Sequence, residues 1–215
     1  MEYRGHTIVL FIAIGLVLAV LAGCASDVRK DRSGFSALDH YNFGLNWLAS
    51  NELQRAEVSF QRTLELDDSF GDAYTQLGLI YYILYERETN IGGNREAISK
   101  YYNQSYNCLR NGLKYNSKNP VAYTGIARLQ IINRQFDGAV ANLLKARELT
   151  TPDNISTDAV ICYELGNCYL AQGRRQEALA EYKNYLQLIP DGAERANIEN
   201  LIRELEEQLE KKPGK

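Results

Sequence analysis

The sequence predicts an all-α fold, a solenoid of about four helix-turn-helix units closed by a C-terminal capping helix. Small residues recur at matched intervals along the chain, which is typical of stacked helical hairpins. The 215 residues include 15 Tyr but only 4 Pro, a balance that favours long helices with aromatic packing over a turn-rich β-sandwich. The formal net charge of −3 argues against a general nucleic-acid binder, because such proteins carry a basic stripe.

Residues 1–23 have the features of a secretory signal. A short head carrying Arg4 precedes an apolar run over residues 7–20, and the segment ends in Leu21-Ala22-Gly23-Cys24. This ending resembles the lipobox of bacterial lipoproteins, which implies that the chain is cut before Cys24 and that Cys24 is then acylated. The alternatives are an uncleaved membrane anchor and an ordinary signal that happens to end in Cys.

Residues 24–36 would join this lipid anchor to the folded part of the chain as a polar tether. Their mixed charge and few apolar side chains leave them too polar to fold alone. Ala25 and Ser26 follow Cys24, where an Asp would favour the inner membrane in enteric lipoproteins. The resemblance therefore implies a lipid-anchored protein of the bacterial envelope, at the outer membrane and facing the periplasm.

The clearest repeating unit covers residues 159–192. In this unit Gly166 is followed, at intervals that recur elsewhere in the chain, by Ala178, Tyr182 and Pro190. A glycine allows a neighbouring helix to approach closely, and the aromatic ring fills the space between the paired helices. Pro190 would end the second helix of the unit.

The first unit, residues 37–70, has the same intervals between Gly44, Ala56 and Phe60, and Gly78 occupies the glycine position of the next unit. This pattern resembles the tetratricopeptide repeat, a helix-turn-helix unit of about 34 residues. The resemblance implies a curved array whose inner wall is formed by the first helix of each unit.

The two middle units depart from the regular repeat spacing. The second unit, residues 71–119, carries an insertion near residues 86–100, which predicts a loop at Gly92-Gly93-Asn94 and a long second helix after it. In the third unit, residues 120–153, Ala127 takes the place of the glycine. A smaller insertion near residues 154–158 has the composition of a loop.

Residues 193–215 predict a capping helix and a frayed tail. Apolar residues at intervals of three and four form one stripe, from Ile198 to Leu209, and charged residues occupy the opposite face. A solenoid needs such a polar-faced helix to cover its apolar end. A docking helix for a partner is the alternative.

Three cysteines remain besides Cys24. Cys162 and Cys168 are six residues apart, so on one helix they lie on different faces and about 9 Å apart along the axis, too far for a disulfide. Small buried core residues are the expected role of the three thiols. A bond from Cys108 to either of the others stays open.

The repeat register predicts an apolar, tyrosine-rich partner-binding groove on the inner wall, and we expect it to receive a helix or an extended apolar segment of a protein partner. In this groove Arg128 would face a carboxylate or carbonyl, and Asn167 would bond to backbone. The alternative is that the chain's own N-terminal segment or a symmetric copy fills the groove. The expected groove residues are Tyr41, Leu45, Leu48, Leu79, Tyr82, Ile83, Arg128, Ile131, Ile132, Tyr163, Asn167 and Leu170.

No catalytic, cofactor-binding or metal-binding motif is found in the sequence. His40 is the one histidine outside the signal, and the carboxylates fall mostly on polar helix faces. We therefore expect no enzymatic activity, no cofactor and no metal site.

Signal, tether and repeats together resemble the pilotin-type lipoproteins of type IV pilus biogenesis. The resemblance implies a scaffold for partner proteins in an envelope assembly such as a pilus or secretion complex. An adaptor for cell-wall hydrolases and a carrier of a small apolar ligand are the alternatives.

Overall fold

The structure is a computed structural model of the chain, and it describes residues 29–191 and 194–210. The predicted signal, the lipidated Cys24, the first part of the tether and residues 211–215 of the predicted tail lie outside the described residues. The helices are α2 (Ala37–Ala49), α3 (Leu53–Leu66), α4 (Gly71–Asn90), α5 (Arg95–Tyr115), α6 (Pro120–Ile132), α7 (Phe136–Leu149), α8 (Ile155–Ala171), α9 (Arg175–Leu188) and α10 (Arg195–Glu210).

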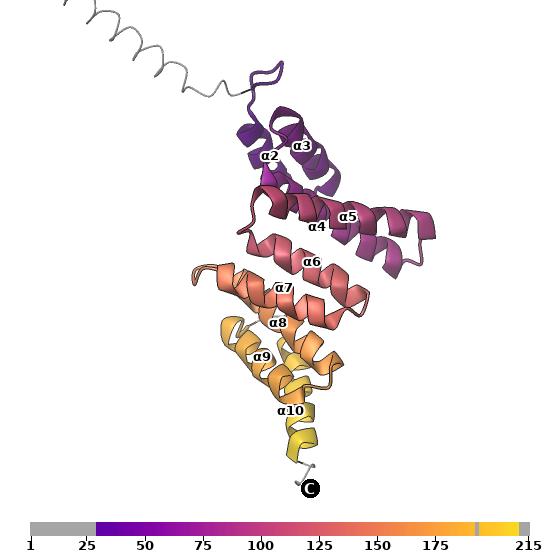
Figure 1. Cartoon of the computed structure of the whole chain (residues 1–215), viewed down its shortest axis with the longest axis vertical. Helices are drawn as coiled ribbons and strands as arrows, with labels where there is room; N and C mark the ends of the chain where they lie inside the picture. Colours follow the sequence, from indigo (N-terminus) through magenta and orange to yellow (C-terminus); the bar gives the residue numbers. More distant parts are fainter. Residues whose placement is uncertain (1–28, 192–193, 211–215) are drawn as a thin grey trace, which may run out of the picture.

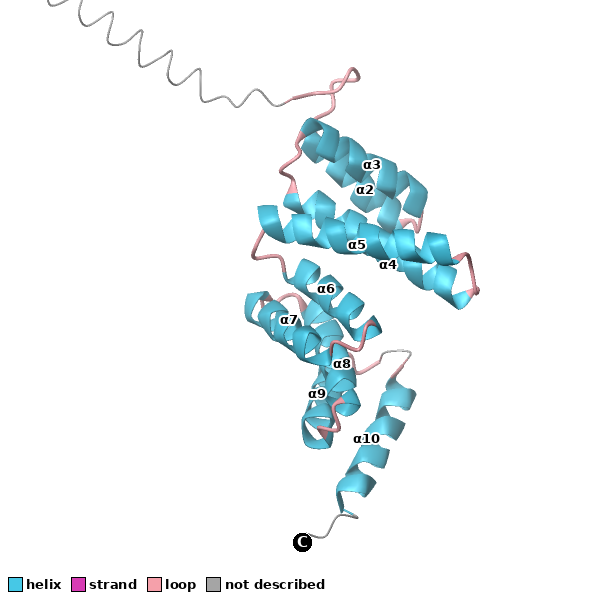
Figure 2. Cartoon of the chain, turned by 45° about the vertical axis from the view of Figure 1, so that its right-hand side comes forward, coloured by secondary structure: helices cyan, strands magenta, loops and turns pink. Residues whose placement is uncertain are grey.

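The helices form four antiparallel hairpins, α2–α3, α4–α5, α6–α7 and α8–α9, which stack one after another along the long axis of the molecule (Figure 1). Each second helix packs on the first helix of the next hairpin, and α10 packs on α9. Figure 2 shows helices throughout the described residues, where the one β-pairing is an isolated bridge between Lys30 and Ser36. The predicted all-α solenoid is therefore confirmed.

Helices α4 and α5 form the longest hairpin and extend beyond their neighbours in the stack (Figure 1). They contain 20 and 21 residues, compared with 13 and 14 in the first hairpin. The extra residues thus lengthen both helices as well as forming the turn. Gly92 adopts a positive φ of 64° in this turn, and the Asn94 side chain accepts a hydrogen bond from the Glu96 amide.

Helix α8 begins earlier than predicted. The residues after Asn154 were expected to form a loop, but they form the first turn of α8, because the Asn154 side chain accepts a hydrogen bond from the Thr157 amide. The inserted residues between the third and fourth hairpins therefore extend a helix.

The small residues at the predicted register positions allow the hairpins to close. A Cβ atom on Gly44 would lie 2.5 Å from the Phe60 ring, and one on Gly166 would lie 2.6 Å from the Tyr182 ring. Leu109 takes the place of the aromatic in the long hairpin, where a Cβ on Gly78 would lie 2.7 Å from it. These contacts join the two helices of each hairpin.

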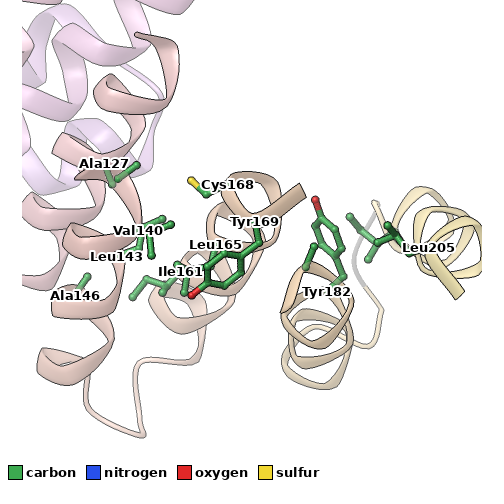
Figure 3. Close-up of a cluster of buried hydrophobic side chains, with 13 residues drawn as sticks. Ala127, Val140, Leu143, Ala146, Ile161, Leu165, Cys168, Tyr169, Tyr182 and Leu205 are labelled. Carbon is green, nitrogen blue, oxygen red and sulfur yellow. The ribbon is translucent and has the colours of Figure 1, made fainter. Parts of the chain in front are cut away.

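A continuous core runs through the C-terminal half of the array. Its side chains extend from Ala127 on α6 through Leu143 and Leu165 to Tyr182 on α9, and they continue to Leu205 on α10 (Figure 3). On α10, Ile198 and Leu205 are buried, while the charged residues of the opposite face are exposed. The apolar stripe predicted for this helix therefore covers the C-terminal end of the solenoid.

The three cysteines of the described residues are free thiols. Cys162 and Cys168 are buried on α8, and Cys108 is half-buried on α5. The disulfide that the sequence left open is therefore not formed in the structure.

Candidate partner-binding surface

The first helices of three neighbouring hairpins form a common hollow. Helices α4, α6 and α8 lie next to one another, and their side chains enclose about 210 Å³. Apolar groups form most of its wall, and one guanidinium group lies among them. The lining residues are Leu79, Val121, Thr124, Gly125, Arg128, Ser156, Thr157 and Val160.

Arg128 is held against the wall of this hollow by neighbours from two other helices. Its Nε donates to Glu164 Oε1 at 2.7 Å, and its guanidinium carbon lies 5.7 Å from the centre of the Tyr82 ring. The Tyr82 hydroxyl in turn donates to Glu86 Oε1 at 2.7 Å. Burial and the neighbouring Glu86 carboxylate raise the pKa of Tyr82, so Tyr82 remains a neutral donor at physiological pH.

The twelve predicted groove residues fall into three groups. Leu79 and Arg128 line the hollow itself. Leu45, Ile83 and Ile132 are exposed, by 37%, 43% and 37%. The remaining seven pack at least in part against core clusters or other side chains of the chain: Tyr41, Leu48, Tyr82, Ile131, Tyr163, Asn167 and Leu170.

Two of the predicted groove tyrosines have ring contacts within their own chain. The Tyr41 ring lies 4.9 Å from Phe70 and 5.5 Å from Phe60, and Tyr163 lies 5.8 Å from Tyr185, measured between ring centres. Phe60 lies on α3 and Tyr185 on α9, so each ring contacts the second helix of its own hairpin.

Arg128 and Asn167, predicted to contact a partner, each have a polar partner within the chain. Arg128 already pairs with Glu164, and Asn167 Oδ1 accepts a hydrogen bond of 2.8 Å from the Tyr182 hydroxyl. Asn167 therefore positions a core tyrosine. Arg128 remains at the hollow, but with an acidic neighbour from its own chain.

Sequence reasoning missed Glu164 and Gly125 as parts of this surface. Glu164 stands two residues before Gly166, and Gly125 two residues before Ala127. A search for opposite charges near the register positions of adjacent first helices would have found the pair of Arg128 and Glu164. Gly125 has no feature in the sequence that marks it as part of this surface. In the structure its lack of a side chain leaves room for Leu109, because a Cβ atom on Gly125 would lie only 2.9 Å from that side chain.

The described residues contain no group of three or more His, Cys, Asp or Glu side chains that could hold a metal ion. Searched over the same residues, no helix combines the length and the apolar character needed to cross a bilayer.

Comparison with known proteins identifies the repeat. Residues 159–191 match the family model described as a tetratricopeptide repeat. Over 75 residues the chain is 29% identical to the type IV pilus assembly protein PilF of Pseudomonas aeruginosa. This match spans 34% of the chain and only 30% of PilF.

Solved structures share the fold. The structure of P. aeruginosa PilF has a TM-score of 0.58 at 17% identity, with 83% of this chain and 77% of PilF covered. PilW, described as a widely conserved type IV pilus biogenesis factor, has a TM-score of 0.59 at 16% identity, with 77% and 70% covered. IFIT1, solved with Gppp-AAAA, reaches 0.66 at 16% identity over 82% of this chain and 40% of its own. The chain therefore has the tetratricopeptide-repeat fold and is related to bacterial pilus biogenesis proteins, while the fold by itself does not select a partner.

Proposed function

We propose that this tetratricopeptide-repeat chain is a membrane-anchored scaffold of the bacterial envelope, facing the periplasm. Its concave face binds a helix or extended segment of a partner protein. The assembly it serves is a type IV pilus or a secretion complex, and the similarity to PilF supports this assignment.

The observation that carries the proposal is the common hollow of α4, α6 and α8. Apolar side chains from three helices, with Leu79 and Val160 among them, surround the guanidinium group of Arg128. An apolar surface with a single fixed charge suits a peptide that buries an apolar side chain and places a carboxylate or carbonyl beside it. The exposed Ile83 and Ile132 lie on the same two first helices, α4 and α6, and extend the apolar surface.

The size of the hollow favours a peptide over a small ligand. Pockets for small molecules usually enclose about 300–1,000 Å³ and bury most of the ligand. The hollow of about 210 Å³ is smaller than that range and accommodates one or two side chains of a longer segment. This argues against the alternative of a carrier for a small apolar ligand, whereas an adaptor for cell-wall hydrolases would use the same surface.

Substitution of exposed residues tests the groove without disturbing the core. The double variant Ile83→Asp with Ile132→Asp should reduce recovery of partners from detergent-solubilised envelopes, measured by quantitative mass spectrometry, by at least about tenfold. Leu144→Asp with Ile155→Asp is the matched control, because these residues are similarly exposed, by 40% and 49%, and line none of the hollows described. Equal recovery of the same partners by both double variants would refute the concave binding site.

The membrane anchor is tested separately through Cys24. Cells grown with radiolabelled palmitate should label the chain, and Cys24→Ser should abolish the label and release the protein from the membrane fraction. A chain that is never labelled would refute the anchor and leave the groove untouched.

A further inference from the structure

The N-terminal end of the array holds a second and larger hollow, between α2 and α3. It encloses about 740 Å³, and Phe43, Trp47 and Val58 are its apolar lining residues. Val58 is 65% exposed. Polar groups surround these residues: His40, Asn46, Ser50, Ser59, Gln61, Arg62 and Glu65.

Comparison with the other hairpins shows that no helix covers this hollow within the described residues. Phe43 directly precedes Gly44, and its counterparts before Gly78, Ala127 and Gly166 are almost completely buried, whereas Phe43 is 37% exposed. Each counterpart shares a core cluster with a side chain of the preceding second helix: Phe60, Leu109 and Leu143 in turn. Within the described residues no helix precedes α2, and only the segment around Asp31 and Phe35 contacts this first face, which we call the helix seat. The three counterparts are Leu77 (3%), Ile126 (8%) and Leu165 (0%).

One position in the seat carries a polar side chain where the other hairpins carry a buried apolar one. Asn46, two residues after Gly44, is exposed, and its counterparts Ile80, Leu129 and Cys168 are fully buried. An apolar residue at this place would suit a permanently covered face. An Asn beside the exposed Phe43 instead suits a face that is covered reversibly.

The two ends of the array differ in this respect. At the C-terminal end α10 covers α9 with Ile198 and Leu205 and turns a charged face outward, so another copy stacking head to tail would meet charges. The apolar run of residues 7–20 is a poor occupant of the N-terminal seat, because it belongs to the predicted signal, which is removed when the chain is cut before Cys24.

We propose that the N-terminal seat binds a second copy of this chain, with α2 of each copy lying in the hollow of the other. On α4, α6 and α8 the matching face is covered by the second helix of the preceding hairpin, α3, α5 or α7. The seat is the same face on α2. The seat carries charges of both signs, because Arg62 pairs with Glu65 and lies 3.9 Å from Asp31, so a two-fold arrangement can set opposite charges of the two copies against each other. Phe43, edge-on to Phe35 at 5.2 Å between ring centres, enters the hollow of the second copy.

The lipid anchor brings these ends together, and this step rests on the anchoring proposed for Cys24. Cys24 lies five residues before Arg29, a reach of at most about 18 Å. The N-terminal ends of all anchored copies therefore lie within about 18 Å of the same membrane surface. Confinement of this kind raises the effective concentration towards the millimolar range, so a weak contact suffices.

Sedimentation of the mature chain carrying Cys24→Ser tests the contact in solution, at concentrations up to about 1 mM. We expect a monomer–dimer equilibrium whose dissociation constant rises at least about tenfold with Phe43→Asp and with Val58→Asp. Leu144→Asp, at a residue that is 40% exposed on α7, should leave the constant unchanged. Val58 is the safer variant if Phe43→Asp lowers the thermal stability, because Val58 is the more exposed of the two.

Photo-crosslinking from position 58 in intact cells tests the occupant. A product of twice the chain mass, lost with Phe43→Asp, supports the proposal. The proposal is overturned if the chain is monomeric at every concentration and gives no crosslinked dimer. It is also overturned if a dimer forms whose dissociation constant is unchanged by both variants. Crosslinks to another protein or to lipid at the expense of the dimer also overturn it. A chain that is not labelled with palmitate would refute the anchor but not the dimer in solution. Ile83→Asp, which tests the groove, should also leave the dimer unchanged. The three proposals can therefore fail independently.

Trp47, the single Trp of the chain, reports on the same seat. Dimer formation should shift its fluorescence emission to shorter wavelength in step with the sedimentation result. A blue shift on adding phosphatidylglycerol vesicles to a protein that stays monomeric would overturn the proposal in favour of a lipid surface.

Discussion

Gly166→Ala tests whether close approach at the register glycine joins the two helices of a hairpin. The new Cβ would lie 2.6 Å from Cε1 and 2.8 Å from Cζ of Tyr182. Reaching an ordinary contact of 3.4 Å requires a movement of about 0.8 Å. The Tyr182 ring is fully buried, and its hydroxyl donates to Asn167, so it has little freedom to give way.

Two effects of opposite sign decide the result. Replacing a helical glycine by alanine gains about 1 kcal/mol of helix propensity. Overpacking a tight core site costs about 1–3 kcal/mol. Because the obstacle is a buried ring, we place the steric cost at the upper end, about 3 kcal/mol, which leaves a net loss of about 2 kcal/mol. For a chain of this length such a loss lowers the melting temperature by roughly 4–8 °C.

Gly138→Ala is the control, because the same chemical change there meets a different neighbour. Its Cβ would lie 2.8 Å from Nε2 at the end of the flexible Gln130 side chain, whose Oε1 accepts a single hydrogen bond from Asn142, so the amide can shift more easily than a buried ring. We expect Gly138→Ala to be neutral or to stabilise by up to about 1 kcal/mol. Urea unfolding followed by circular dichroism at 222 nm measures both variants.

A coupling experiment isolates the contact. Tyr182→Leu removes the ring atoms, so Gly166→Ala in that background should lose most of its cost. The reasoning is refuted if Gly166→Ala matches Gly138→Ala in stability, or if its cost is the same with and without the Tyr182 ring.

Two further predictions concern buried polar groups. Arg147 donates to both carboxylate oxygens of the buried Glu181, at 3.0 and 2.6 Å, so Arg147→Ala should cost about 1–3 kcal/mol in urea unfolding, and Glu181→Gln added to it should recover part of the loss. Unchanged stability of Arg147→Ala would contradict this. Burial raises the pKa of Cys108 and Cys162 to about 11 and that of Cys168 to about 12, so at pH 8 N-ethylmaleimide should modify them at least about 100-fold more slowly in the folded chain than in urea. Since the folded state holds these thiols protonated, their stabilisation is complete below pH 9 and is lost as the pH rises towards 12; a stability that increases over this range would contradict the assignment.

The fold could be predicted from the sequence because each repeat contains a local steric rule. A glycine or alanine on the first helix and a large side chain at the matching position of the second specify a hairpin, as Gly44 with Phe60 and Gly166 with Tyr182 show. The start of α8 was mispredicted because the polar residues near Asn154 suit a loop and a helix cap equally well. Composition alone does not separate the two.

The binding surface could be predicted only in part. Register places Leu79 and Arg128 on the inner wall, and both line the hollow. Tyr41 and Tyr163 stand three residues before the register glycine, the position of Thr124 in the hollow, but their rings reach Phe60 and Tyr185 on the second helix of their own hairpin. Whether a long side chain at the edge of a helix face turns into the groove or into the core depends on the space left by other hairpins, which the sequence of one helix does not contain.

The ion pair of Arg128 and Glu164 explains how an apolar groove can be selective. Arg128 is 29% exposed and Glu164 12%, so the pair is largely removed from water, and the cost of desolvating its two charges offsets much of their attraction. Glu164 binds Nε, while a guanidinium group has five N–H donors in a fixed plane. A partner carboxylate or carbonyl that reaches the hollow therefore meets a guanidinium already held in place by Glu164 and the Tyr82 ring, so little side-chain freedom is lost on binding. A partner segment without such a group would cover Arg128 and remove water from its remaining N–H donors. The free-energy cost of these unpaired donors would favour segments with a carboxylate or carbonyl over other segments of equal apolar area.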